Sequence, residues 1–178
     1  NRLDKNTSGL LVVAKTLETQ TNLVRQLQNR TMKRDYLALV HGHVQFSGQV
    51  NVPIGRHPIQ RVKMAVNKNG KDARTYYMVK EKINGYTLLQ CSLDTGRTHQ
   101  IRVHMLSIGH PLVGDPIYGS KPKKSSQEIM KLITGFPRQA LHAKYLELIH
   151  PDTGQKVMWE SELPKDFDEL LLTLRKAS

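Results

Sequence analysis

Cysteine is nearly absent from the sequence: Cys91 is the one cysteine among 178 residues. A single cysteine cannot build a disulfide framework or a cysteine metal site within the chain, so we expect a reducing compartment, the cytoplasm. No secretory or transit segment is apparent. Long apolar runs are also missing and no basic amphipathic helix stands out, so we expect no membrane partner.

Several patterns that carry chemistry are lacking as well. The glycines form neither a phosphate-binding loop nor a dinucleotide fingerprint, and no serine lies in a nucleophile elbow. The histidines do not have metal-ligand spacing: His41 and His43 lack a nearby carboxylate or cysteine, and His99 and His104 are five residues apart on a predicted helix. These absences disfavour a metal-dependent nuclease and predict no metal site.

Acidic residues are scarce relative to basic ones. The chain has 27 lysines and arginines against 15 aspartates and glutamates, a net charge of +12 and an isoelectric point near 9.9. Such a surface concentrates polyanions, so nucleic acid is the leading partner. The length and a hydrophobic share of 38% are enough for one domain with its own core.

The pattern of apolar residues predicts an α+β fold, with a mostly antiparallel mixed β-sheet and flanking helices. Helices are expected over Leu17–Asn29 with Thr16 as cap, over Thr98–Ile108 with Thr98 as cap, and from Pro164 onward. Asn84-Gly85 predicts a hairpin turn. The expected strands are Leu10–Ala14, Arg34–Val44, Gln49–Val52, Ala73–Lys82, Tyr86–Leu93 and Ala140–Ile149.

Three features together indicate chemistry on a nucleic-acid base. Asp4 is a lone acid before a Thr-Ser-Gly turn, and by itself it would be interpreted as a cap. Tyr36 lies in a basic context, and a tyrosine in a strand more often belongs to the core. A guanidinium beside the carboxylate would keep it ionised, a tyrosine ring can stack on a base, and further cations can hold phosphates. The arginine-rich segment from Thr95 to His104 could supply those cations.

Five segments, in order along the chain, match the motifs of one known family: Arg2–Leu11, Lys33–Ala38, Gly96–Met105, Gly109–Gly119 and Leu141–Ala143. The sequence resembles the RluA-type pseudouridine synthases, whose signature is H-R-L-D-x-x-T-S/T-G, over roughly residues 2–160. The basic loop at residues 56–64 is most similar to the group within this family that acts on large-subunit ribosomal RNA.

The resemblance implies isomerisation of uridine to pseudouridine in RNA, without cofactor or metal. Asp4 would be the catalytic carboxylate, acting either as a nucleophile or by removing a proton from the sugar; the sequence does not choose between these roles. Tyr36 would stack on the target base, Arg102 would pair with Asp4, and Arg2 would enter the RNA stack. Further residues are expected to contact RNA or to support the site: Arg56, His57, Arg61, Arg97, His99 and Gln100.

The same resemblance bears on the extent of the chain. Family members have histidine where this chain has Asn1, and their catalytic domains begin earlier, with an S4-type RNA-binding domain before them in some groups. We therefore expect residues 1–178 to be the catalytic domain truncated at its N-terminus, with Asp4 close to a frayed end. A monomer is expected, with 23S-type ribosomal RNA favoured over transfer RNA. The alternative function is a non-catalytic basic RNA-binding domain.

Overall fold

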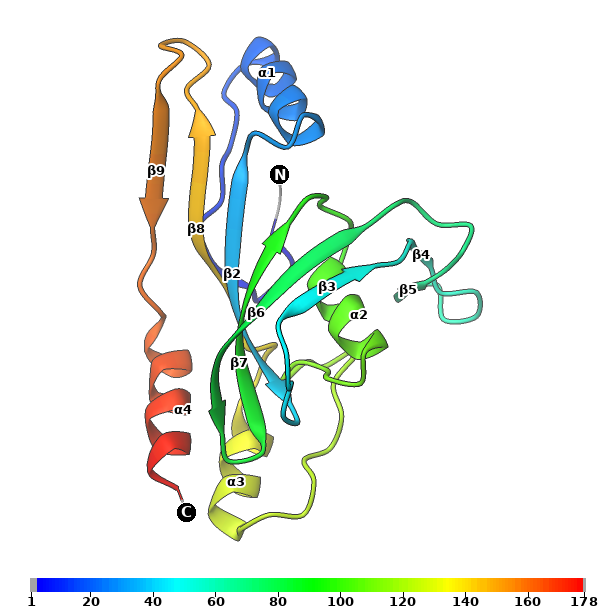
Figure 1. The fold of residues 1–178 in the computed structure, drawn as a ribbon, viewed down its shortest axis with the longest axis vertical. Helices are drawn as coiled ribbons and strands as arrows, with labels where there is room; N and C mark the ends of the chain where they lie inside the picture. Colours follow the sequence, from blue (N-terminus) through cyan, green and yellow to red (C-terminus); the bar gives the residue numbers. More distant parts are fainter. Residues whose placement is uncertain (1–2, 178) are drawn as a thin grey trace.

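The computed structural model describes residues 3–177, in which nine strands and four helices form one layered unit (Figure 1). This confirms the expected α+β class. The helices are α1 (Leu17–Gln28), α2 (Gln100–Ser107), α3 (Gln127–Gly135) and α4 (Lys165–Lys176). The strands are β1 (Ser8–Gly9), β2 (Lys33–His41), β3 (Gly48–Asn51), β4 (Ile54–Arg56), β5 (Met64–Val66), β6 (Arg74–Ile83), β7 (Tyr86–Leu93), β8 (Leu141–Ile149) and β9 (Lys156–Glu160).

The main sheet has the order β1-β8-β2-β7-β6-β3, and β9 also pairs with β8. All its pairings are antiparallel except the short parallel contact between β1 and β8. The expected hairpin is present: β6 and β7 join through Asn84 and Gly85, and both residues have positive φ, as a tight hairpin turn requires. Strands β4 and β5 form a separate two-stranded ribbon.

The alternation along β2 separates two cores, because successive side chains of a strand point to opposite faces. Leu37 and Leu39 pack with α3 and α4 on one face. Tyr36, Ala38 and Val40 pack with α2 on the other face. Helix α1 covers β8 near Leu146, whose β2 partner is Arg34, so α1 and α2 lie on the same face as Tyr36.

The predicted buried strand Leu10–Ala14 is wrong. In this N-terminal segment only Ser8 and Gly9 form a strand pair with β8, and Val13 is 74% exposed. The physical reason lies in β9, a strand that the sequence analysis did not predict. One edge of β8 is occupied along its length by β2, and β9 takes the other edge from Tyr145 to Ile149, so the apolar run has no strand to pair with.

The predicted cap of α2 is also wrong. His99, not Thr98, is the N-cap, with φ of 57° and no capping side chain. The turn before the helix is held instead by Gln100, whose Oε1 accepts from the backbone N–H of Arg97 at 3.0 Å. Helix α2 is buried on nearly every side between the sheet and the β4–β5 ribbon, so its polar residues point into the protein. Helix α3 was not predicted either.

The other two predicted helices are confirmed. Thr16 caps α1 by accepting from the N–H of Thr19 at 3.1 Å. The apolar stripe of α4 is buried in the core, from Phe167 to Leu174. No helix within residues 3–177 is both long and apolar enough to cross a membrane.

Candidate active site

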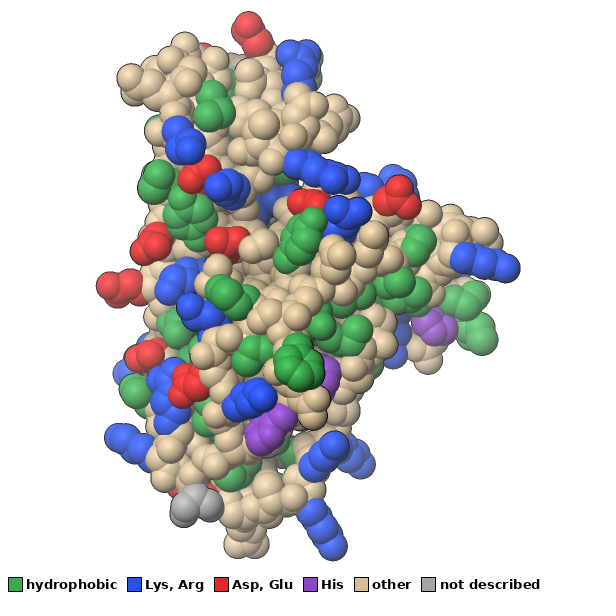
Figure 2. All heavy atoms as spheres, in the orientation of Figure 1, with side chains coloured by type: hydrophobic (Ala, Val, Ile, Leu, Met, Phe, Trp, Pro, Cys, Tyr) green, Lys and Arg blue, Asp and Glu red, His purple; other side chains and the backbone are tan. Residues whose placement is uncertain are grey.

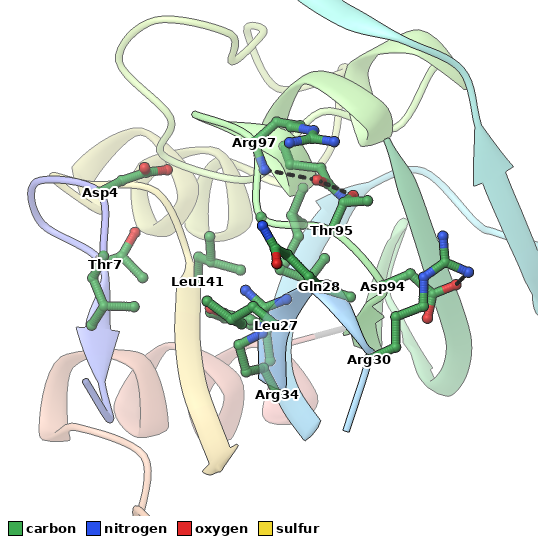
Figure 3. Close-up of a pocket in the computed structure, with 16 residues that line it drawn as sticks. Asp4, Thr7, Leu27, Gln28, Arg30, Arg34, Asp94, Thr95, Arg97 and Leu141 are labelled. Atoms are coloured by element: carbon green, nitrogen blue, oxygen red, sulfur yellow. Dashed lines mark hydrogen bonds and ion pairs between the residues drawn. The ribbon is translucent and has the colours of Figure 1, made fainter. Parts of the chain in front are cut away.

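A cleft of about 590 Å³ opens on the Tyr36 face of the sheet, between the end of α1 and the start of α2 (Figure 3). Strand β2 supplies its floor, and the segment before β1 supplies one wall. Two of the sequence-predicted catalytic residues, Asp4 and Tyr36, line this one cleft although they come from different segments. The lining also includes Leu3, Thr7, Leu27, Arg30, Arg34, Asp94, Gly96, Arg97, Gln100 and Leu141.

Asp4 is held at the rim by a turn and by the short parallel strand that follows. The N–H of Thr7 donates to the carbonyl of Asp4 at 3.0 Å and closes the turn. Gly9 then lies so close to β8 that a Cβ would come 2.1 Å from the carbonyl oxygen of Ala143, and its φ is +109°. Only glycine fits this position, so the Ser-Gly pair fixes where the Asp4 turn meets the sheet.

Side chains from the segment before β8 and from β8 itself anchor the same turn. Gln139 Nε2 donates to the carbonyl of Lys5 at 2.7 Å, and Arg138 Nη1 donates to the carbonyl of Asn6 at 2.9 Å. Ser8 Oγ lies 2.8 Å from Nδ1 of His142, a ring that is 1% exposed. The expectation that Asp4 lies on a frayed end is therefore not what the described residues show, because the turn is tied to the core at several points.

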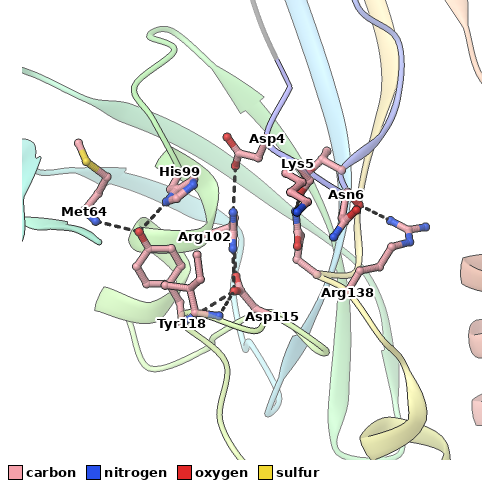
Figure 4. Close-up of polar contacts among 12 residues, drawn as sticks. Asp4, Lys5, Asn6, Met64, His99, Arg102, Asp115, Tyr118 and Arg138 are labelled. Carbon is pink, nitrogen blue, oxygen red and sulfur yellow. Dashed lines mark hydrogen bonds and ion pairs between the residues drawn. The ribbon is translucent and has the colours of Figure 1, made fainter. Parts of the chain in front are cut away.

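Arg102 pairs with Asp4, as the sequence predicted, but Asp4 is its weaker partner. Arg102 Nη1 lies 3.4 Å from Asp4 Oδ2, whereas Nε and Nη2 donate to the two Asp115 oxygens at 2.8 and 2.9 Å (Figure 4). Asp115 thus binds the Nε and Nη2 edge of the guanidinium, and Nη1 points toward Asp4. This fork-to-fork geometry fixes the orientation of the arginine.

Burial and charge oppose each other in this pair. Burial alone would raise the pKa of Asp115, but the Arg102 guanidinium and the N–H groups of Tyr118 and Ile117 hold it below its usual range. Burial alone would lower the pKa of Arg102, and the two carboxylates raise it instead. Both Arg102 and Asp115 therefore stay charged.

The sequence analysis did not single out Asp115, the carboxylate that orients Arg102. It lies in the turn-rich segment before Gly119, where an acid before proline is most simply interpreted as a turn residue, and its Oδ1 does accept from two backbone N–H groups. Tyr118 of the same turn places its ring 5.2 Å from the Arg102 guanidinium and its hydroxyl 2.7 Å from His99 Nδ1 (Figure 4). The sequence did contain one signal for Asp115, because its segment, Gly109–Gly119, is one of the matched motifs.

Tyr36 forms part of the cleft floor and is 7% exposed. Burial raises the pKa of its phenol and the Asp4 charge adds to this, while the Arg34 charge opposes it. The phenol is therefore neutral at ordinary pH. Its place is compatible with both of its possible roles, core packing and a stacking face at the cleft.

The predicted RNA-contact residues fall in separate places. Arg97 lines the cleft, and its Nε donates to the carbonyl of Asp72. Gln100 is 3% exposed and uses its amide within the protein, which favours the second of its expected roles, support of the site. Arg56, His57 and Arg61 lie outside the cleft, at the β4–β5 ribbon and its connecting loop. Arg2 lies outside the described residues.

The surface around the cleft is basic. Lysine and arginine side chains gather around the hollow below α1 in Figure 2, and Arg30, Arg34 and Arg97 are the arginines that line it. Across residues 3–177, no group of three or more histidine, cysteine, aspartate or glutamate side chains is placed to hold a metal ion. The cleft therefore offers two ion-paired carboxylates, Asp4 and Asp94, together with the Tyr36 phenol and several cations.

Comparison with known proteins assigns the class. A family model described as RNA pseudouridylate synthase matches residues 1–107, and the chain belongs to this family. The fold agrees. The structure of human RNA Pseudouridylate Synthase Domain Containing 1 matches with a TM-score of 0.74 and 27% identity, over 99% of this chain and 79% of that one. Human RNA Pseudouridylate Synthase Domain Containing 4 matches with a TM-score of 0.77 and 27% identity, over 98% and 74%.

Curated relatives are more similar in sequence. The chain is 60% identical to ribosomal large subunit pseudouridine synthase D of Nitrosomonas europaea, over 98% of this chain and 50% of that protein. It is 54% identical to the protein of the same name from Pseudomonas aeruginosa, over 99% and 56%, and 48% identical to that of Escherichia coli K12, over 98% and 55%. The chain spans about half the length of these relatives.

Proposed function

We propose that the protein containing this chain is an RNA pseudouridine synthase, and that residues 1–178 belong to its catalytic domain. The reaction is an isomerisation: the bond from the ribose C1′ to N1 of uracil breaks, the base turns, and C1′ bonds to C5, whose proton is lost while N1 gains one. No group is transferred to or from a second reactant. Family membership and the names of the relatives support this reaction.

The observation that carries the proposal is the joint position of Asp4, Arg102 and Tyr36. Asp4 and Tyr36 line one cleft, and Arg102 lies 3.4 Å from the Asp4 carboxylate. In the proposed mechanism the Asp4 carboxylate acts on the target nucleotide, as nucleophile or as base. Arg102 pairs with this carboxylate and orients it, and the Tyr36 ring stacks on the uracil.

The basic residues are assigned to RNA binding. A paired uridine must leave its stack before Asp4 can reach it, and Arg2 would fill the place of the flipped base. Arg97 and His99 border the catalytic groups, and the loop carrying Arg56, His57 and Arg61 would hold RNA farther away. The proposed enzyme acts in the cytoplasm as a monomer, without cofactor or metal.

Large-subunit ribosomal RNA is the proposed substrate. The relatives with 48 to 60% identity are named for the large ribosomal subunit. Mass-spectrometric mapping of pseudouridine in cells that lack the protein tests this choice. We expect specific sites in large-subunit RNA to remain uridine; loss confined to transfer RNA would contradict it.

Asp4→Asn in the full-length protein tests the catalytic assignment. We expect pseudouridine formation to be abolished and RNA affinity to change less than about tenfold, because one carboxylate is a small part of the electrostatics of a strongly basic surface. Arg102 keeps its Asp115 partner, so the fold is retained.

Asp152→Asn is the matched control, since Asp152 is an exposed turn residue outside the cleft and its loss changes the net charge equally. This control should keep wild-type activity. Pseudouridine formation by Asp4→Asn protein would contradict the assignment and favour the alternative, a basic domain that only binds RNA.

A further inference from the structure

Arg34 is a cleft residue within the matched motif Lys33–Ala38, but it has no role in the mechanism above. It lies on β2, two residues before Tyr36, so both side chains point from the same face of the strand. The residue is 7% exposed, yet its side chain forms part of the cleft lining (Figure 3). A guanidinium is thus buried beside the proposed stacking face.

This guanidinium has no hydrogen-bond partner within residues 3–177. Its Nε is buried and unpaired. By contrast, Arg102, Arg138 and Arg175 each donate at least two hydrogen bonds to a carboxylate. Arg34 is therefore a buried cation whose fork of donors is unoccupied.

Asp94, the one acid whose charge raises the pKa of Arg34 among the described residues, does not fill this role. The Asp94 charge opposes the lowering of the Arg34 pKa by burial. Its Oδ2, however, accepts from Tyr76 at 3.0 Å and lies 3.5 and 3.7 Å from Arg74 and Arg30. Gly96 leaves room for the guanidinium, since a Cβ there would come 2.8 Å from Arg34 Nη1.

A buried charge without a partner is costly, and burial lowers the pKa of Arg34. The surroundings favour an anion as its missing partner, because Arg30 and Arg97 line the same cleft. A phosphodiester carries a full negative charge and two oxygens that match the guanidinium fork. The uracil carbonyls are neutral and would compensate the charge less.

We propose that Arg34 binds a backbone phosphate of the RNA next to the target uridine, while Tyr36 stacks on the base. This rests on the proposed function, because it takes the ligand to be RNA with a uridine in the cleft. Arg34 would be a substrate-binding residue that sets the distance between the phosphate and the base.

The test compares Arg34→Met, Arg34→Lys and Lys33→Gln in the full-length protein. The probe is an unmodified transcript of large-subunit ribosomal RNA, bound at several KCl concentrations. Lys33 is the matched control because it is the neighbouring cation on β2 but points to the opposite face, where it is exposed and 3.9 Å from Glu147. Pseudouridine formation and thermal midpoint are measured on the same proteins.

For Arg34→Met we expect about a tenfold or larger loss of affinity, the size that loss of a charged hydrogen bond gives. The slope of log affinity against log salt should become shallower by about 0.7 to 0.9, the value for one lost phosphate contact. Arg34→Lys should restore most of the slope, and Lys33→Gln should stay within about threefold of wild type. The thermal midpoint of Arg34→Met should not fall, because the change removes an unpaired buried charge.

Wild-type affinity and salt slope in Arg34→Met would overturn the inference, whether or not pseudouridine forms. So would a loss of affinity accompanied by a lowered thermal midpoint that Arg34→Lys does not relieve, which would show a structural role. If the wild-type protein binds the transcript but makes no pseudouridine, the proposed function fails, while the comparison of salt slopes still decides whether Arg34 binds phosphate.

Discussion

Two arginine–aspartate pairs of similar geometry lie in different surroundings. Arg102 and Asp115 form a bidentate pair whose side chains are 3% and 0% exposed. Arg138 and Asp166 form one with distances of 2.8 Å, but the Asp166 side chain is 44% exposed. The same chemistry therefore contributes differently, because water solvates the second pair and cannot solvate the first.

Asp115→Asn and Asp166→Asn test this difference at the residue scale. The first change leaves a buried guanidinium facing an amide, so we expect a loss of about 3–5 kcal/mol in the free energy of unfolding. The second should cost less than about 1 kcal/mol. Denaturant unfolding measures both. Under the proposed function, Asp115→Asn should also lower pseudouridine formation more than RNA affinity, because Arg102 is then no longer held in its orientation. Equal losses of stability in the two variants would contradict the expected difference between a buried and an exposed pair.

At the scale of elements, helix α4 shows how an amphipathic stripe places a segment. Its buried residues Phe167, Leu170, Leu171 and Leu174 pack against α3 and the Leu37 face of the sheet. Leu172 follows directly but is 44% exposed. The helix thus covers the face of the sheet opposite the cleft, and its contribution is to stability.

Leu171→Ala and Leu172→Ala form a matched pair on adjacent residues of α4. The first should lower the free energy of unfolding by about 2–5 kcal/mol, since it removes a 1% exposed side chain and leaves a cavity. The second should stay within about 0.5 kcal/mol of wild type. Urea denaturation is the measurement. If Leu172→Ala proved as destabilising as Leu171→Ala, the orientation of α4 on the sheet would be wrong.

At the scale of the whole molecule, buried histidines link stability to pH. His41, His104 and His142 are 7%, 0% and 1% exposed. Burial lowers the pKa of all three rings, with Lys123 adding to the effect at His41, while hydrogen bonds to backbone carbonyls oppose it at His104 and His142. Their neutral forms belong to the folded state.

Acidification should therefore destabilise the protein. In the unfolded chain a histidine takes up a proton as the pH falls below about 6.5, whereas these buried rings resist protonation. The unfolded state then binds more protons, so the thermal midpoint should fall as the pH goes from about 7 to about 5. His104→Gln should show a smaller fall, whatever its midpoint at pH 7. A midpoint that is constant or rises over this range would contradict the prediction.

The pattern of apolar residues by itself determined most of the fold. Strand alternation in β2, the hairpin at Asn84-Gly85 and the stripe of α4 are local regularities, and each is found as predicted. Local pattern failed at Leu10–Ala14, because pairing there depends on which edge of β8 is free, and β9 is more than a hundred residues away.

In the candidate site, too, some features follow from the sequence and others only from the tertiary structure. The motifs predicted Asp4, Tyr36 and Arg102 as site residues, and the structure places Asp4 and Tyr36 at one cleft with Arg102 beside Asp4. Only the tertiary structure decided that Asp115 orients Arg102, and that Arg34 is buried beside Tyr36 with no hydrogen-bond partner among residues 3–177. The burial and the hydrogen-bond partners of a side chain depend on segments that are distant in sequence and meet in space. The sequence around Asp115 or Arg34 therefore does not predict them.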